Sequence, residues 1–267
     1  MSADLDRLSF NQITADHLDL GQVIEACAAA GFGWIAPWRH KLVPDAGERI
    51  RAAGLRASSL CRGGFFPAPS AAERRERDAD NRAAVDEAAA LAADLLVLVC
   101  GPAPDGDLPA ARRQVLEGIE ALAPYAADHG VRLGIEALHP MMIGERSVVV
   151  TLAQALDLAE RFDAGEVGVV VDAYHVWWDP ELERQLERAA GRVLAYHVSD
   201  WLVPTTDLLA GRGMMGDGVI DLPRLRALVD AAGYDGPIEV EVINPSNAEL
   251  PIAELMARIR RSFAESS

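Results

Sequence analysis

The sequence predicts an α/β fold, a (β/α)8 TIM barrel that forms a single domain over residues 1–267. Strand-like segments recur about every thirty residues, and most are near-continuous apolar runs, as expected of parallel strands covered on both faces. They span 8–12, 33–38, 55–61, 95–101, 132–138, 167–174, 193–201 and 238–243. Segments with helical periodicity alternate with them, and eight such units form a barrel that typically takes about 250 residues.

Residues typical of helix ends mark several of the intervening segments. They are a C′ glycine at Gly31, capping-box pairs at Ser70 and Glu73 and at Thr151 and Gln154, and the N-cap Asp221 ahead of Pro223. A final helix is expected over about 248–265. A doubly wound open sheet is the alternative, but no glycine-rich GxGxxG turn follows the first strand. The connection 202–221 is long enough to cover the barrel mouth.

The composition argues against two classes of partner. The formal net charge is −16, with acidic residues spread along the chain, so the surface repels phosphate backbones and no nucleic acid is expected. No apolar stretch reaches the ~20 residues of a bilayer span, and the N-terminus lacks a secretory pattern. Three cysteines without CxxC spacing fit a reducing compartment. We therefore expect a cytoplasmic protein with a small-molecule partner and no membrane contact.

Four potential metal ligands stand at the ends of the last four strand-like segments. They are Glu136, Asp172, His197 and Glu241. In a barrel these strand ends converge on one face, where carboxylates packed together would repel each other without a cation between them. Three carboxylates and one imidazole suit one divalent ion, for which we favour Mn²⁺ over Mg²⁺, Co²⁺ or Zn²⁺. Interior polar residues that satisfy one another are the competing interpretation.

Further candidates lie beside this quartet. Glu239 alternates with Glu241 along the last strand, so both point to one side, and Glu239 could lie deeper in the barrel or take its place. Asp200 could orient an imidazole or contact substrate hydroxyls. Trp38 follows the second strand near the mouth, and Arg62 follows the third, where it could contact a carboxylate or phosphate.

Aromatic residues near the predicted mouth form another candidate group. Trp177, with Trp178 and Trp201, could form a wall against a sugar ring or an aromatic aglycone. Ordinary loop packing or an oligomer interface would account for the same residues. A homo-oligomer or a second subunit stays open, because no interface pattern stands out in the sequence.

The stretches around these residues resemble one group of enzymes over essentially the whole chain. They read IEALHP, VVVDAYHVWWDP, LAYHVSDW, GRGMMGDGVIDLPRL and GYDGPIEVEVIN. They are similar to the sugar phosphate isomerase/epimerase family of xylose isomerase-like TIM barrels. The resemblance implies that the quartet holds one divalent metal and that Glu136 and Glu241 also transfer protons. It further implies that His175 and Arg212 contact substrate oxygens.

The function implied is in carbohydrate metabolism. A metal-dependent isomerase or epimerase would remove a proton next to the carbonyl of a sugar or keto-sugar through a metal-stabilised enediolate. Met142 departs from the pattern, because the epimerases carry a glutamate there, and His139 offers a base nearby. The alternative is therefore a lyase that eliminates the aglycone from a 3-keto-glycoside, linked through carbon or oxygen, at the same metal site. An inactive ligand-binding or partner subunit is the non-enzyme alternative.

Overall fold

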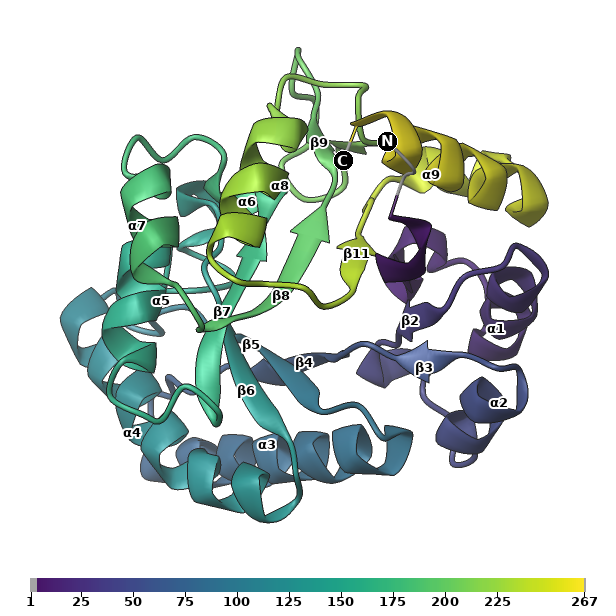
Figure 1. The fold of residues 1–267 in the computed structure, drawn as a ribbon. Helices are drawn as coiled ribbons and strands as arrows, with labels where there is room; N and C mark the ends of the chain where they lie inside the picture. The colour runs from purple at the N-terminus through teal and green to yellow at the C-terminus, as the bar shows by residue number, and fades with distance from the viewer. Residues whose placement is uncertain (1–3, 267) are drawn as a thin grey trace.

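The computed structural model describes residues 4–266. Its parallel strands surround a central axis, and helices cover them on the outside (Figure 1). The strands are β1 (Leu8–Asn11), β2 (Trp34–Ala36), β3 (Arg56–Ala57), β4 (Leu60–Gly64), β5 (Leu95–Val99), β6 (Arg132–Glu136), β7 (Val167–Asp172), β8 (Val193–Val198) and β11 (Ile238–Val240). Their order is β3-β2-β1-β11-β8-β7-β6-β5-β4. A parallel bridge from Trp38, just after β2, to Cys61 on β4 closes the ring. The predicted (β/α)8 barrel is confirmed.

Every predicted segment contains a strand, but two segments are divided. The third, 55–61, is split into β3 and β4 at Ser58 and Ser59, and β4 continues to Gly64. Ser58 lies inside the barrel, where its hydroxyl contacts Ser9 and Glu239, and its backbone N–H still donates to Ile35 on β2 at 2.9 Å. The seventh, 193–201, is split into β8 and a separate β9 (Asp200–Trp201). β9 pairs antiparallel with β10 (Arg212–Gly213).

The helices alternate with the strands as expected. They are α1 (Leu20–Ala29), α2 (Ala46–Ala52), α3 (Ala71–Leu91), α4 (Leu108–Asp128), α5 (Leu152–Ala159), α6 (Ala173–Val176), α7 (Leu182–Arg188), α8 (Leu222–Ala231) and α9 (Ile252–Ser266). The last begins later than predicted, because a 3-10 turn over Pro245–Glu249 precedes it. No helix within residues 4–266 has both the length and the apolar character needed to cross a bilayer.

The predicted N-caps are confirmed at their backbone contacts. Ser70, Thr151 and Asp221 each accept the backbone N–H three residues on. Neither predicted capping box closes, because the side chains of Glu73 and Gln154 do not accept the backbone N–H of the N-cap residue. Ser70 Oγ donates to the Glu73 side chain, and the Gln154 side chain accepts from the backbone N–H of residue 150. A closed box occurs instead at the start of α1.

Side chains inside the barrel change from apolar to polar along the strands. An apolar cluster that includes Leu95, Val97 and Val170 fills part of the interior. Gly134 lies beside this cluster, since a Cβ there would meet Val170 and Leu95. Two residues further along β6 and β7 the inward positions are Glu136 and Asp172, because strand residues alternate between faces. The apolar layer thus supports a polar layer at the carboxyl ends of the strands.

Candidate metal centre

The predicted ligands meet at the carboxyl end of the barrel. One ligand atom from each of Glu136, Asp172, His197 and Glu241 lies within 4.8 Å of the others. All four residues are at most 5% exposed. Strand register contributes to this arrangement, since Asp172 on β7 pairs with His197 on β8, the next strand. The sequence prediction that these side chains would come together is therefore confirmed, and their role as ligands stays a prediction.

The imidazole of His197 is the strongest sign of a cation site. Its Nδ1 lies 3.5 Å from Glu136 Oε1 and 3.6 Å from Glu241 Oε2, and it makes no hydrogen bond although it is buried. Burial would lower the pKa of His197, but Glu239, Glu136 and Glu241 raise it well above its ordinary value. A buried lone pair facing two carboxylates needs a proton or a metal ion between them. The residues present therefore fit a divalent ion.

Glu239 lies beneath the quartet rather than in it. Its Oε2 is 3.3 Å from His197 Nε2 and accepts from Asn11 Nδ2 at 3.1 Å. Its Oε1 accepts from Ser58 Oγ at 2.8 Å. Of the two inward glutamates on the last strand, Glu241 thus reaches the cluster, and Glu239 takes the deeper position that the sequence left open.

Arg212 inserts a positive charge among the carboxylates. Its Nη1 donates to Asp172 Oδ2 at 2.9 Å and to Glu241 Oε2 at 3.0 Å. Its guanidinium lies over the Tyr174 ring, with Cζ 4.6 Å from the ring centroid. Burial alone would raise the pKa of Asp172, but Arg212 and His175 hold it below its usual value.

His175 lies between two N–H donors. Its Nδ1 is 3.1 Å from the backbone N–H of His139, and its Nε2 is 3.1 Å from Nη2 of Arg212. Nε2 in turn lies 3.5 Å from Asp172 Oδ2. Burial lowers the pKa of His175 to about 3, so the ring stays uncharged at neutral pH. A neutral imidazole accepts through one nitrogen only, so His175 accepts from one of these two donors.

Six of the predicted site residues line one small cavity, which are Trp38, Arg62, Glu136, His175, Arg212 and Glu241. Trp38 is fixed there, because its Nε1 donates to Asn11 Oδ1 at 2.7 Å. Met142 lines the same cavity, so a thioether faces the space where the resembling epimerases carry a carboxylate. Arg146 also lines it and was not a sequence candidate. The one sequence feature that points to Arg146 is its place four residues after Met142, in the loop that follows the sixth strand.

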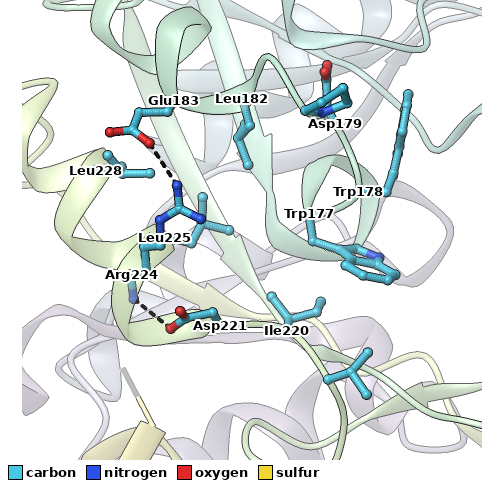
Figure 2. A pocket seen from close by; sticks show the side chains of 12 residues that line it. Trp177, Trp178, Asp179, Leu182, Glu183, Ile220, Asp221, Arg224, Leu225 and Leu228 are labelled. Carbon is cyan, nitrogen blue, oxygen red and sulfur yellow. Dashed lines mark hydrogen bonds and ion pairs between the residues drawn. The ribbon is translucent and has the colours of Figure 1, made fainter.

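Two of the other predicted residues, His139 and Trp177, pack elsewhere at the barrel mouth. His139 packs its ring against Trp201, with centroids 4.9 Å apart, and burial lowers its pKa. Trp177 lines a separate cavity of about 360 Å³ between α7 and α8, where Arg224 bonds Glu183 across the opposite end (Figure 2). Its packing 5.6 Å from Trp201 matches the loop-packing interpretation of the aromatic group.

Asp200 organises the backbone of the loop above the barrel. Its two oxygens accept backbone N–H groups from residues 201, 216, 218 and 220, at 2.8 to 3.0 Å. It is 1% exposed. These four bonds satisfy both carboxylate oxygens of Asp200. The substrate contact expected from the sequence stays a prediction.

Curated relatives of this chain carry the names of several different enzymes. The chain is 29% identical over 237 residues to a 3-dehydroshikimate dehydratase of Pseudomonas aeruginosa, which covers 84% of the chain and 36% of the relative. It is 24% identical over 162 residues to an inosose isomerase of Halalkalibacterium halodurans, covering 58% of the chain and 54% of the relative. The chain thus spans about a third to a half of the length of these relatives.

Solved structures extend the comparison to the whole chain. Protein SMc04130 from Sinorhizobium meliloti 1021 is 46% identical, with a TM-score of 0.94 over 98% of this chain and 99% of that one. The IolI protein with a bound zinc atom superposes with a TM-score of 0.81 at 18% identity, over 97% of each chain, and so shares the fold. A family model described as xylose isomerase-like TIM barrel matches residues 24–262. The chain therefore belongs to the xylose isomerase-like TIM barrel family.

Proposed function

We propose that this protein is a divalent-metal-dependent isomerase or epimerase that removes a proton next to the carbonyl of a sugar or keto-sugar. The observation that carries the proposal is the buried quartet, whose ligand atoms lie within 4.8 Å of one another at the barrel mouth. Relatives named as an isomerase and as a dehydratase support an enzyme of this general kind. Mn²⁺ is the ion that we favour, because the donor set is mainly carboxylate oxygen.

The chemistry divides between the ion and the side chains. A divalent ion held by the quartet would supply Lewis-acid polarisation of the carbonyl. Glu136 and Glu241 extend from β6 and β11, which two other strands separate, so their carboxylates border the cavity from different positions on the ring. We assign them the removal and return of the proton.

Two neighbouring donors would hold the substrate oxygens. Arg212 and His175 both line the cavity, with Arg212 Nη2 3.1 Å from His175 Nε2. A fixed positive charge in a buried site stabilises negative charge that develops on oxygen during proton removal. We assign both residues to substrate binding, with Trp38 along the wall of the same cavity.

Elimination is the second candidate. The cavity carries Met142 rather than a carboxylate, and one relative is named as a dehydratase, an enzyme that eliminates water. Removal of the same proton from a 3-keto-glycoside could be followed by loss of the aglycone. His139 would then act as a base from the edge of the site, where its ring packs against Trp201.

Metal content tests the first step of both schemes. Protein purified without added metal, and again after chelation and Mn²⁺ addition, is compared with Glu241→Gln and with the exposed control Glu249→Gln. We expect about one ion per chain in the wild type and the control, and loss of the ion in Glu241→Gln. Failure of the wild type to hold stoichiometric metal under either condition would contradict the proposal and favour a binding or partner subunit.

Keto-sugars incubated in D₂O then separate the two reactions. Deuterium at the carbon beside the carbonyl of an intact substrate supports isomerisation or epimerisation. Release of the aglycone from a 3-keto-glycoside supports the lyase. A cytoplasmic location, with a homo-oligomer or a second subunit, stays a prediction.

A further inference from the structure

Two arginine side chains line the cavity of Glu136 and Glu241 without pairing with a carboxylate of residues 4–266. Arg62 extends from β4, and Arg146 lies in the loop after the 3-10 turn over Pro140–Met142. Arg39 and Arg188 each bridge two carboxylates, whereas Arg56 and Arg82, like Arg62, lie over aromatic rings without an ion pair to the described residues. In a chain of net charge −16, unpaired guanidinium groups at a partly buried site need an explanation.

The flat face of the Arg62 guanidinium packs on an aromatic ring, which leaves the N–H groups along its edge free to bind a ligand. Its Cζ lies 3.9 Å from the centroid of the Phe65 ring, and its N–H groups make no hydrogen bond to the described part of the chain. A guanidinium stacked in this way still presents its row of donors, which matches the two oxygens of a carboxylate or phosphate. The pKa of Arg62 is lowered, first by burial and then by the neighbouring charge of Arg146.

Arg146 is fixed through its backbone. Its N–H donates to the carbonyl of Met142 at 2.8 Å, and its own carbonyl accepts from Gly101 at 2.9 Å. The side chain makes no bond to any of residues 4–266 and is half-buried at the cavity. Two like charges held near each other with partial burial are unfavourable, and an anion between them would remove that repulsion.

The rest of the cavity gives these arginines no counter-charge of their own. Val99, Leu138, Met142 and Leu209 line it with apolar groups. Met142 matters most, because a glutamate at this position would supply the missing negative charge. The carboxylates Glu136 and Glu241 belong to the quartet, where His197 and Arg212 already contact Glu241.

We propose that Arg62 and Arg146 form an anion subsite, so that the substrate carries a carboxylate or a phosphate group at the end opposite its carbonyl. This inference rests on the proposed function for the carbonyl end, which would reach Glu136 and Glu241. The substrate class becomes a keto acid or a phosphorylated keto-sugar instead of a neutral sugar. The two guanidinium groups would supply most of the discrimination against uncharged analogues.

Anion binding by the whole protein tests the subsite without knowledge of the substrate. Inorganic phosphate and D-glycerate are titrated calorimetrically, one at a time, into metal-free and Mn²⁺-loaded protein. Wild type is compared with Arg62→Gln/Arg146→Gln and with Arg51→Gln/Arg75→Gln, which removes the same charge from two exposed positions on α2 and α3. Matching circular dichroism and urea midpoints show that each variant is folded.

We expect at least one of the two anions to bind wild type and control alike, and to bind the cavity variant at least tenfold more weakly. Tighter binding of phosphate would indicate a phosphate ester, and tighter binding of glycerate a carboxylate. Equal affinity in all three proteins, or no anion binding by the wild type, would overturn the subsite.

Mn²⁺ affinity of the same variants separates this inference from the proposed function. If the cavity variant loads Mn²⁺ normally and binds anions as tightly as wild type, the proposed subsite is wrong and the metal site is unaffected. If the wild type binds anions through both arginines but never loads metal, the proposed function is wrong and the subsite is retained.

Discussion

Glu239 Oε2 lies 3.3 Å from Nε2 of His197, and the other ring nitrogen, Nδ1, faces Glu136 and Glu241. Glu239 is itself fixed by Asn11 and Ser58 and is 1% exposed. A carboxylate that holds the far nitrogen of an imidazole sets its tautomer and strengthens it as a ligand. We therefore expect Glu239 to act as a positioning residue for the proposed metal centre.

Glu239→Gln should weaken Mn²⁺ binding without abolishing it. Loss of a carboxylate behind a ligating histidine typically costs about 10- to 100-fold in metal affinity. Mn²⁺ titration followed by electron paramagnetic resonance measures the effect, with the exposed Glu249→Gln as the control. Affinity equal to that of wild type would show that Glu239 does not position His197. A loss as complete as that of Glu241→Gln would place Glu239 in the ligand set instead.

Metal affinity should rise with pH through neutrality. Burial, followed by the charge of Glu241, raises the pKa of Glu136 to about 7. Because the folded state holds this proton more tightly than the unfolded chain does, the associated stability is present at low pH and is lost as the pH rises through about 7. Binding of a cation needs the ionised form, so each ion bound near or below that pH displaces the proton.

We therefore expect apparent Mn²⁺ affinity to increase by up to about tenfold per pH unit below pH 7 for this one proton. His197, whose pKa is raised well above its usual value, adds a second proton and extends the increase above pH 7. Calorimetry in buffers of different ionisation enthalpy counts the protons released. Affinity that does not change between about pH 6 and pH 8 would contradict this assignment.

The quartet was predictable because strand periodicity fixes which residues share a face. Each ligand ends an apolar run, and in a parallel barrel those ends must converge. Glu136, Asp172, His197 and Glu241 could therefore be grouped without knowledge of a single loop. The barrel itself followed from the spacing of the same runs.

Features that depend on loops and on side-chain pairing could not be predicted. Ser58, where the third strand divides, donates its hydroxyl to Glu239, a partner 181 positions away that no local pattern identifies. The position of Arg146 depends on the path of the loop after β6, and no periodic pattern describes that path. Asp200 could be recognised as polar near a strand end, but its four backbone partners come from a loop whose conformation the carboxylate itself holds.

Asp200→Ala should loosen that loop. Four backbone N–H groups lose a charged acceptor, and unsatisfied buried donors together with lost charge-assisted bonds should cost about 2–4 kcal/mol of unfolding free energy. Hydrogen exchange at residues 216, 218 and 220 should become faster, while exchange in β7 stays slow. Asp207→Ala is the control, because its carboxylate accepts two backbone N–H groups on an exposed segment. Unchanged exchange at these amides would show that the loop holds its conformation without Asp200.

Gly64 and Gly54 provide a matched test of how tightly β4 is packed beside the site. Both have positive φ, +101° and +77°, so alanine is strained at either position by about 1 kcal/mol. At Gly54 a Cβ would meet nothing within 4 Å, whereas at Gly64 it would overlap the carbonyl oxygen of Val99 on the neighbouring strand.

Gly64→Ala should therefore lower the free energy of unfolding by about 3 kcal/mol or more, and Gly54→Ala by about 1 kcal/mol. Urea unfolding followed by tryptophan fluorescence measures both. Gly64 ends the strand that carries Arg62, so a displaced β4 should also weaken phosphate or glycerate binding in Gly64→Ala but not in Gly54→Ala. Equal stability of the two variants would mean that β4 can move away from Val99 at little cost, and that Arg62 is not held rigidly by the barrel.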